Sequence, residues 1–365
     1  MKVAIIRRKF RFGGGGEKAA ENYLKRYVKG NSSVSLLTQD WSGSLPQDVQ
    51  LKKIAVSGNR VRSLFEFTQR VTRFLADSDF DLVQSHEWIP KGVDILRLGD
   101  GLHSVWFECL SNFRGGCRRL LLYISPFHRL KMYYEKKSIM SADLKQILVN
   151  STLVKDQLIS RYPDLKTPII VQRNPVSDEF FLSSSRRINS SRTSNKLRML
   201  FVGSGWERKR LDICLQALDA CEFTTLDIFG HDKLEKRIRS WVAKQHFSNR
   251  VAFHGTKPLS IDDYWDYDLL LALSLYDPFP NAVSEALVSN LKVITSENCG
   301  AVDFVDGKTV FVAKNLEEIV GYIIDIHAKQ PASTRLTINK RYRSIFRFDC
   351  SHDDLRKNEN PTHGI

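Results

Sequence analysis

The stretch RMLFVGSGWERKRLDICLQALDACEFTTLDIFG, residues 198–230, decides the fold. A mostly apolar run at 198–202 ends in Gly203, a helical pattern follows at 211–218, and a second apolar run at 225–229 also ends in glycine. Strand, glycine turn, helix and strand in this order are typical of a parallel α/β sheet covered on both faces. The stretch therefore predicts part of a doubly wound domain.

The same alternation continues on the C-terminal side of this stretch. The expected segments are a helix at 233–244, a strand at 251–253, an apolar strand at 269–273, a helix at 282–289 and a strand at 293–295. We expect them to complete one Rossmann-like domain over residues 176–345.

The N-terminal half repeats the pattern, with a first strand that runs into a row of glycines. Strands are expected at 3–6, 34–37, 53–56, 81–84 and 93–96, and helices at 17–28 and 63–75. Ser63 and Glu66 have the spacing of a capping box at the start of the second helix. We expect a Rossmann-like domain over 1–175, with the boundary near Asn174–Pro175.

Two such domains predict a ligand cleft between them, because open α/β sheets bind ligands at the carboxyl edges of their strands. The expected fold class is α/β, with two doubly wound domains that face each other across this cleft. The Ser- and Arg-rich stretch 183–195 is expected to be a loop near the junction. The polar tail 351–365 has no apolar periodicity and is expected to be disordered.

The composition is that of a folded chain with about two domains: 365 residues, of which 42% are hydrophobic and 26% charged. The net charge of +14 favours an anionic partner, such as nucleic acid, a nucleotide diphosphate or an anionic lipid surface. The six cysteines include no CxxC pair, which indicates neither a disulfide framework nor a zinc module. The apolar stretch at 3–6 is too short for a signal peptide, and no run reaches the ~18 residues of a membrane span. We therefore expect a protein that is soluble or lies on a membrane surface.

The segment SLYDPFPNAVSEAL, residues 274–287, carries the strongest chemical signal. An apolar strand ends before Asp277, a helix begins near Asn281 and Ala282, and Glu285 lies eight positions after Asp277. A helix N-terminus offers free N–H groups and partial positive charge to a phosphate, and the two carboxylates can accept hydrogen bonds from sugar hydroxyls. One such site could hold a sugar nucleotide. The alternative is a turn-capping Asp and a Glu on an exposed helix face.

This segment resembles the signature of the retaining GT-B glycosyltransferases of family 4, in which two glutamates are separated by seven residues. The resemblance covers about residues 1–345 and is strongest to the branch with the lipopolysaccharide core glucosyltransferase. It implies that Glu285 binds the nucleotide ribose and that Asp277, which stands where the family has Glu, contacts the donor sugar. It also implies a nucleotide diphosphate sugar, most simply a UDP-sugar, as donor substrate and no separate cofactor.

The segment 201–210, FVGSGWERKR, resembles the glycine turn and basic pair of the same family. Gly203 lets the backbone approach the donor closely. Arg208 and Lys209 are expected to neutralise the diphosphate and the charge that develops as it leaves. Arg210 stands where the family usually has Gly. The alternative is a solvated basic helix start.

In the N-terminal half, the segment 98–103, LGDGLH, resembles the Asp-Gly-x-His segment of this branch. The resemblance implies that Asp100 orients the acceptor or assists its proton, and that His103 donates a hydrogen bond to the donor sugar or its phosphate. The alternative is an ordinary Asp-Gly turn beside a packed histidine.

Three further segments match family loops more weakly. Gly15 and Gly16 belong to a glycine loop expected to lie against the donor or acceptor, although a hinge has the same composition. Gly300 is expected to contact the donor, whereas its neighbour Cys299 is expected to pack. Arg173 stands in a boundary segment and could point into the cleft.

The acidic pair of Asp266-Tyr267-Asp268 looks like a metal-binding Asp-x-Asp motif. It immediately precedes an apolar strand, as the strand-opening Asp of the resembled family does. We therefore interpret this pair as structural and expect no required metal.

Basic and apolar residues alternate over 114–137. The stretch has seven Lys or Arg residues and one acid, interleaved with Leu, Ile, Phe, Met and Tyr. This composition is typical of a surface that rests among lipid headgroups and predicts contact with an anionic membrane. The alternative is a packed helix with a solvated basic face. No nucleic-acid motif accompanies the stretch, so nucleic acid is not an expected partner.

Together these features predict a retaining glycosyltransferase that moves a hexose from a nucleotide diphosphate sugar to a glycan or glycolipid at the cytoplasmic face of a bacterial membrane. Such an enzyme would act in lipopolysaccharide or polysaccharide synthesis. One alternative is a protein of this fold that binds glycan or lipid and has lost turnover. Another is a GT-B protein of a different class, such as a sugar-nucleotide epimerase or a phosphorylase.

Overall fold

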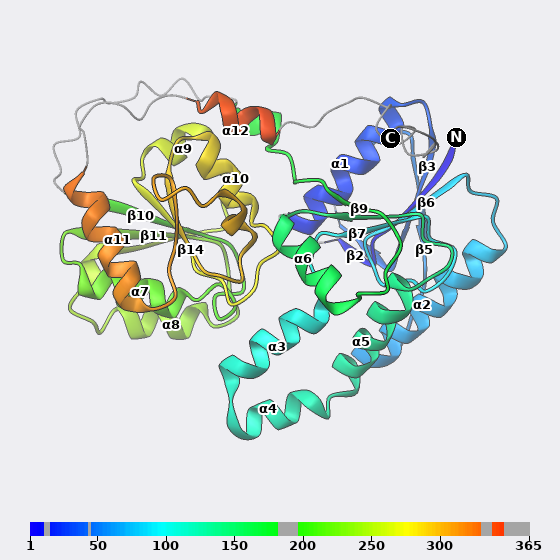
Figure 1. The fold of residues 1–365 in the computed structure, drawn as a ribbon, viewed down its shortest axis with the longest axis horizontal. Coiled ribbons are helices and arrows are strands. Elements are labelled where there is room, and N and C mark those ends of the chain that lie inside the picture. The colour runs from blue at the N-terminus through cyan, green and yellow to red at the C-terminus, as the bar shows by residue number, and fades with distance from the viewer. Residues whose placement is uncertain (11–14, 43–44, 182–195, 330–337, 347–365) are drawn as a thin grey trace, which may run out of the picture.

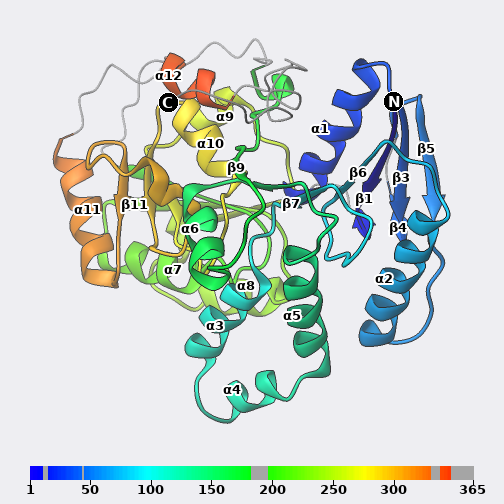
Figure 2. The ribbon, with the colours of Figure 1, turned by 45° about the vertical axis from the view of Figure 1, so that its right-hand side comes forward.

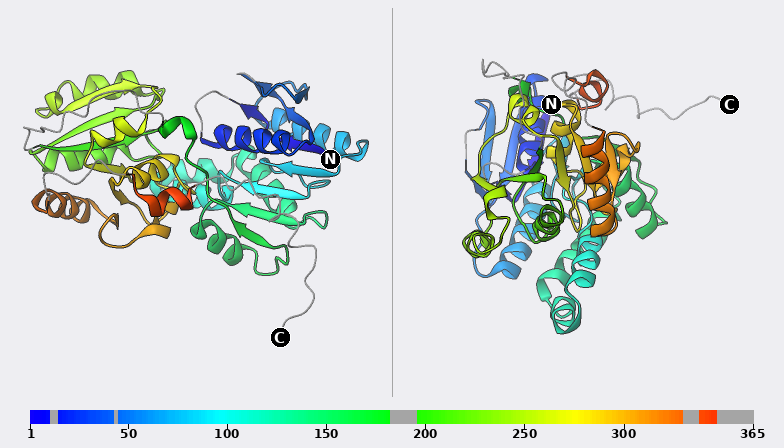
Figure 3. Two further views of the ribbon diagram at one scale, coloured as in Figure 1. Left: turned by 90° about the horizontal axis from the view of Figure 1, so that it is seen from above. Right: turned by 90° about the vertical axis from the view of Figure 1, so that its left-hand side faces the viewer.

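The computed structural model describes residues 1–10, 15–42, 45–181, 196–329 and 338–346. The chain forms two lobes, each built on a parallel sheet with helices on both faces (Figure 1). Seen from above, the lobes lie side by side (Figure 3). The predicted loop at 183–195 and the predicted tail at 351–365 lie outside the described residues.

The N-terminal lobe contains a seven-stranded sheet in the order β5-β3-β1-β6-β7-β8-β9. All its neighbouring strands pair in parallel. Its strands are β1 (Lys2–Ile6), β3 (Ser33–Thr38), β5 (Val49–Lys53), β6 (Leu82–Ser85), β7 (Ile95–Leu98), β8 (Gln146–Val149) and β9 (Ile169–Val171). A two-stranded parallel sheet of β2 (Lys9–Phe10) and β4 (Asp40–Trp41) adjoins it.

Two apolar clusters cover the two faces of this sheet, because successive side chains of a strand point to opposite sides. Ala4 and Ile6 belong to one cluster, and Val3 and Ile5 to the other. The helices of this lobe are α1 (Gly15–Lys29), α2 (Arg60–Ala76), α3 (His103–Arg114), α4 (Gly116–Tyr123), α5 (Pro126–Ile139) and α6 (Thr152–Arg161).

The C-terminal lobe contains a six-stranded parallel sheet in the order β12-β11-β10-β13-β14-β15. Its strands are β10 (Leu197–Val202), β11 (Thr224–Phe229), β12 (Val251–Gly255), β13 (Leu269–Ala272), β14 (Lys292–Thr295) and β15 (Val310–Val312). The strand order changes direction between β10 and β13. Loops after these two strands therefore diverge and leave room for a ligand.

Helices again cover both faces of the sheet. They are α7 (Leu211–Ala220), α8 (Glu235–Val242), α9 (Ile261–Trp265), α10 (Asn281–Val288), α11 (Leu316–Ala328) and α12 (Lys340–Ile345), with 3₁₀ turns η1 (Asp178–Phe181), η2 (Ser248–Arg250) and η3 (Gly300–Phe304). Val176 and Phe180 already pack into the core of this lobe, together with Tyr342 of α12.

A helical hairpin projects from the N-terminal lobe. Helices α3, α4 and α5 form it, and α4 lies at its tip, away from both sheets (Figures 1 and 2). Large apolar side chains of α4 and its C-terminal boundary are exposed: Leu120, Leu121, Tyr123 and Ile124. No described helix is both long enough and apolar enough to cross a membrane.

The fold class of two facing Rossmann-like lobes is confirmed, while several local predictions are wrong. The strand expected at 53–56 is β5, which ends at Lys53. The capping box of Ser63 and Glu66 does not form, because α2 begins earlier and Asn59 accepts hydrogen bonds from the first-turn N–H groups. Glu66 instead pairs with Arg62 one turn away.

Candidate active site between the lobes

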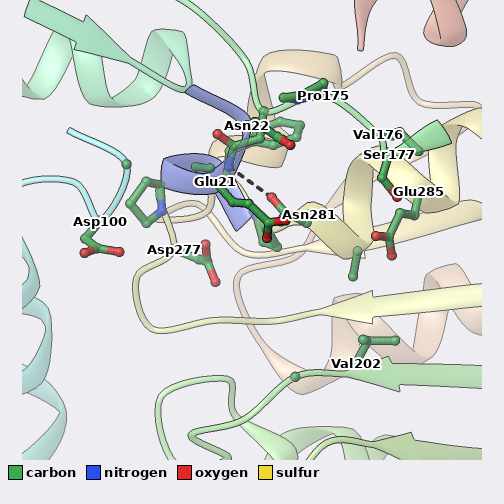
Figure 4. Close-up of a pocket in the computed structure, with 18 of the residues that line it drawn as sticks. Glu21, Asn22, Asp100, Pro175, Val176, Ser177, Val202, Asp277, Asn281 and Glu285 are labelled. Carbon is green, nitrogen blue, oxygen red and sulfur yellow. Dashed lines mark hydrogen bonds between the residues drawn. The ribbon is translucent and has the colours of Figure 1, made fainter. Parts of the chain in front are cut away.

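A cavity of about 2410 Å³ lies between the two lobes. Loops at the carboxyl ends of β1 and β7 line it from the N-terminal lobe, and the loops after β10 and β13 line it from the other. Asp100 and Asp277 face the same space from opposite sides, and Glu285 lies farther along the C-terminal wall (Figure 4). The cavity therefore stands where the fold predicts a ligand site.

The C-terminal wall contains a compact charged triplet. Arg208 and Lys209, in the turn after β10, donate to the same Asp277 oxygen at 2.9 and 3.2 Å. Burial alone raises the pKa of Asp277, but Lys209 and Arg208 hold it below its ordinary value. Asp277 is therefore ionised at neutral pH. The triplet keeps one surplus positive charge beside the cavity.

The N-terminus of helix α10 completes this wall. In the part of the chain that the structure describes, no side chain caps α10, and its first residues, Asn281 and Ala282, line the cavity. Asn174 of the linker donates to the Asn281 side chain at 3.0 Å. One turn farther on, Glu285 accepts a hydrogen bond from the Tyr264 hydroxyl at 2.6 Å. This wall combines a helix N-terminus with fixed charges, an arrangement that suits a phosphate-bearing ligand.

The N-terminal wall contains a second ion-paired acid. Arg7, at the end of β1, donates to Asp100 at 2.9 Å and lies 3.8 Å from Glu87. Arg7 lowers the pKa of Asp100 against the opposing effect of desolvation. Asp100 is therefore a carboxylate that can accept a hydrogen bond from a ligand hydroxyl, and a weak proton acceptor.

His103 begins helix α3 and lies in an aromatic cluster. Its ring stacks on Trp106 and on His128, and its Nε2 lies 3.1 Å from His128 Nδ1. Burial, together with Lys131, His128 and Arg60, lowers the pKa of His103 to about 2. The imidazole is therefore neutral at physiological pH and can donate or accept one hydrogen bond without adding charge.

One tyrosine joins the two walls. The Tyr276 hydroxyl accepts a hydrogen bond from the Leu102 N–H at 3.1 Å and donates to Gln157 at 3.2 Å. Gly101 has φ +68°, and a Cβ there would overlap the Tyr276 hydroxyl. This close approach explains why the residue after Asp100 is a glycine. It also fixes the position of Asp100 relative to Asp277.

A second contact between the lobes lies outside the cavity lining. Asp303 of η3 accepts hydrogen bonds from the Thr152 and Leu153 N–H groups at 2.7 and 3.2 Å. Arg173 pairs with Asp303 at 2.8 Å and lies over the Phe304 ring. The prediction that Arg173 could point into the cleft is therefore wrong, because this buried carboxylate holds it.

The structure brings most predicted site residues to one cavity. Its lining includes Asp100, His103, Gly203, Arg208, Lys209, Asp277, Asn281, Ala282 and Glu285. Gly300 is not part of the lining; it is buried so tightly against the Pro278 carbonyl and Ser151 that a side chain would not fit. In this structure Gly300 therefore packs against these residues and does not face the donor site as predicted. Gly15 and Gly16 are the first two residues of α1 instead of a free loop.

Two minor predictions concern a metal and a thiol. Asp268 is buried and accepts a hydrogen bond from the Arg198 N–H at 2.7 Å, which ties β13 to β10. Within the described ranges, no group of three or more His, Cys, Asp or Glu could hold a metal ion.

Burial raises the pKa of Cys299 to about 11, as expected for a packed thiol.

Sequence reasoning missed Arg7, Glu87 and Tyr276. Arg7 was visible as the start of a basic turn after the first strand, and Tyr276 stands beside Asp277 in the segment with the strongest signal. Neither position shows its partner in the sequence, because the partners lie 93 and 174 residues away.

Comparisons with known proteins agree with this geometry. The family model described as glycosyl transferases group 1 matches residues 184–343, and that described as Glycosyltransferase Family 4 matches residues 13–180. Together they span both lobes and the cavity between them. The chain is a GT-B glycosyltransferase of family 4. No curated protein matches this glycosyltransferase by sequence.

Solved structures share the fold at low identity. WaaG, a glycosyltransferase involved in lipopolysaccharide biosynthesis, superposes with a TM-score of 0.77 at 18% identity, over 94% of this chain and 95% of its own. A sucrose-phosphate synthase from Thermosynechococcus elongatus gives 0.72 at 16% identity, over 94% of each chain. Anabaena HepE, solved with UDP-glucose, gives 0.62 at 15% identity, over 98% of this glycosyltransferase and 100% of HepE.

Proposed function

We propose that this glycosyltransferase transfers a hexose, with retention of configuration, from a UDP-sugar to a glycan or glycolipid in cell-envelope polysaccharide or lipopolysaccharide synthesis. The observation that carries the proposal is the meeting of Arg208, Lys209 and Asp277 beside the α10 N-terminus, with Asp100 across the cavity.

On the donor side, the diphosphate lies against Arg208, Lys209 and the first turn of α10. These groups offer cations and N–H donors where charge develops as the nucleotide departs. Glu285 accepts hydrogen bonds from the ribose hydroxyls, and Asp277 faces the hexose. HepE, which shares the fold, was solved with UDP-glucose, which supports a nucleotide sugar as donor here.

The reaction breaks the bond between the hexose anomeric carbon and the diphosphate oxygen. The acceptor hydroxyl oxygen forms the new bond on the same face, and its proton passes to the departing phosphate oxygen. Asp277 stays ion-paired with the two cations, so it serves orientation better than covalent attack. Asp100, held ionised by Arg7, orients the acceptor hydroxyl.

The projecting hairpin provides the membrane contact of this proposal. Exposed Leu120, Leu121 and Ile124 lie on α4 and its end, among exposed basic side chains that include Arg118 and Arg119. Apolar insertion adds to an attraction of about 1 kcal/mol for each basic residue near an anionic leaflet. The enzyme docks peripherally through 114–137, at the cytoplasmic face, where a lipid-linked acceptor lies close to the cavity.

The decisive experiment measures nucleoside diphosphate release and sugar transfer with a panel of donors and lipid-linked glycan acceptors. Transfer with one donor, and a product whose anomeric configuration matches that donor, supports the proposal. Binding without turnover under every acceptor supports a weakened glycan-binding protein, whereas donor isomerisation without any acceptor supports an epimerase.

A further inference from the structure

The N-terminal wall holds two cations that the donor chemistry does not use. Arg60 is the first residue of α2, and Lys131 lies on α5; both line the cavity. They converge on one aromatic ring, with Arg60 Cζ 3.6 Å and Lys131 Nζ 5.6 Å from the centroid of Phe127.

The carboxylates of this wall are already engaged by another cation. Glu87 and Asp100 both pair with Arg7, and Glu87 also accepts from the Arg8 N–H. Both acids raise the pKa of Lys131, which burial lowers. Among the described residues, no carboxylate forms an ion pair with Arg60 or Lys131.

The position of these cations is electrostatically costly. Arg60 stands at the positive end of a helix whose first turn has no acidic residue. Burial and the nearby Arg8 lower the pKa of Arg60, and the charge of Arg60 helps to lower the pKa of Lys131. Two cations kept together without a directly paired carboxylate among the described residues are typical of a binding site, where function outweighs local stability.

A second, smaller cavity adjoins Arg60. Trp106 and His128 line both the main cavity and a second cavity of about 220 Å³, and Arg60 lines both as well. The second cavity reaches Leu110 of α3 and Leu122 of α4, at the base of the projecting hairpin. An aromatic side chain beside cations suits a ligand with an apolar sugar face and an anionic substituent.

We propose that Arg60 and Lys131 form an acceptor subsite for an anionic substituent, a phosphate or a carboxylate carried by the acceptor sugar. The donor diphosphate has its own cations, Arg208 and Lys209, on the C-terminal wall, and Arg208 lines the second cavity as well. The second anion site therefore belongs to the acceptor. This inference rests on the proposed function, since it names the acceptor class of the same cavity.

The test uses the full chain saturated with UDP, so that the donor site is filled. Titration calorimetry compares glucose, glucose 6-phosphate and glucuronate as probes. We expect at least one anionic sugar to bind tenfold or more tightly than glucose. Preference for glucose 6-phosphate identifies a phosphate, and preference for glucuronate identifies a carboxylate. Equal affinity for all three sugars overturns the inference.

Variants assign the preference to this pair. Arg60→Met and Lys131→Met each lower anionic-sugar affinity several-fold, and the double variant removes the preference over glucose. The matched controls are Arg73→Met on α2 and Lys91→Met, exposed residues of the same lobe outside the cavity. Equal losses in controls and site variants contradict the assignment.

UDP affinity separates the two levels of the proposal. It stays unchanged in every one of these variants if they fold and the donor site is intact. Failure of the unaltered protein to bind UDP or any nucleotide sugar removes the proposed function itself. Normal UDP binding without anion preference removes the acceptor subsite alone.

Discussion

The two walls of the cavity use positive charge in opposite ways. On the C-terminal wall, Arg208 and Lys209 are both tied to Asp277, so the cations are oriented before a ligand arrives. On the N-terminal wall, Arg7 forms ion pairs with Glu87 and Asp100. Arg60 and Lys131 instead both lie near the Phe127 ring. Under our proposal, this difference means that one wall is preorganised for a constant group, the diphosphate, and that the other keeps two cations for a variable acceptor.

The largest effect is expected on the preorganised wall. Lys209→Met removes a cation from the departing diphosphate and should lower kcat by about 10²–10³-fold, as measured by nucleoside diphosphate release. Arg237→Met, an exposed cation of α8 outside the cavity, is the matched control. Unchanged turnover in the Lys209 variant would break the comparison at its stronger side.

Asp100 tests the acceptor wall. Asp100→Ala should reduce kcat by about 10²-fold, because the acceptor hydroxyl loses its orienting carboxylate, while UDP affinity changes less than about twofold. Asp156→Ala on α6, an exposed acid remote from the cavity lining, serves as the control. A parallel loss of UDP affinity would mean that the two walls do not divide donor and acceptor.

Glu285 provides the reciprocal experiment. Glu285→Ala should weaken UDP binding by about 10–100-fold in calorimetry, since a carboxylate that accepts hydrogen bonds contributes about 1.5–3 kcal/mol. Glu317→Ala, an exposed acid in the first turn of α11, should leave it unchanged. Unaltered UDP affinity in the Glu285 variant would discredit the ribose role.

The hairpin should influence location more than chemistry. Leu120→Ser combined with Leu121→Ser should reduce sedimentation with anionic vesicles by about five- to tenfold, because apolar surface no longer inserts. Nucleotide affinity should be unaffected. Ile159→Ser, an exposed apolar residue of α6, is the control. Vesicle binding that survives the double substitution and responds only to salt would leave the basic residues as the whole attachment.

The smallest effect concerns His103 and pH. The pKa of His103 is about 2 in the folded protein and about 6.5 in the unfolded chain. Below pH 6.5 the imidazole is therefore protonated in the unfolded chain but not in the folded protein. Stability associated with His103 is therefore complete above pH 6.5 and declines as the pH falls. His103→Phe should reduce the loss between pH 7 and about pH 5.7 by about 1 kcal/mol in denaturant titrations. An identical pH slope in both proteins would show that the imidazole titrates freely.

Local patterns sufficed where a few neighbouring residues decide the structure. The run 198–202 is a strand because it is short, apolar and closed by glycine, and it forms β10. The capping box failed because Asn59 offers the same hydrogen bonds four residues earlier, and a cap depends on which helix start packs best. The bounds predicted for the strand at 53–56 are wrong for a related reason. Apolar residues on both sides of Lys53 allow more than one register.

Long-range partners could not be predicted from these patterns. Arg7 contacts Asp100 across 93 residues, and the Tyr276 hydroxyl reaches Leu102 across 174. The residues next to a basic turn or a tyrosine do not indicate which distant residue it will contact. The same holds for Gly300, whose close packing against Pro278 shows only in three dimensions.

The amino-acid sequence by itself determined the two parallel α/β lobes and the motif that combines Asp277, Glu285 and a helix start, because strand, turn and helix preferences act between near neighbours. Only the tertiary structure decided which charges neutralise one another: Asp277 with two cations, Asp100 with Arg7, and Arg60 with no carboxylate among the described residues. Ion pairing depends on distances of a few ångströms, and those distances are set when loops far apart in the sequence meet at the carboxyl edge of each lobe's sheet.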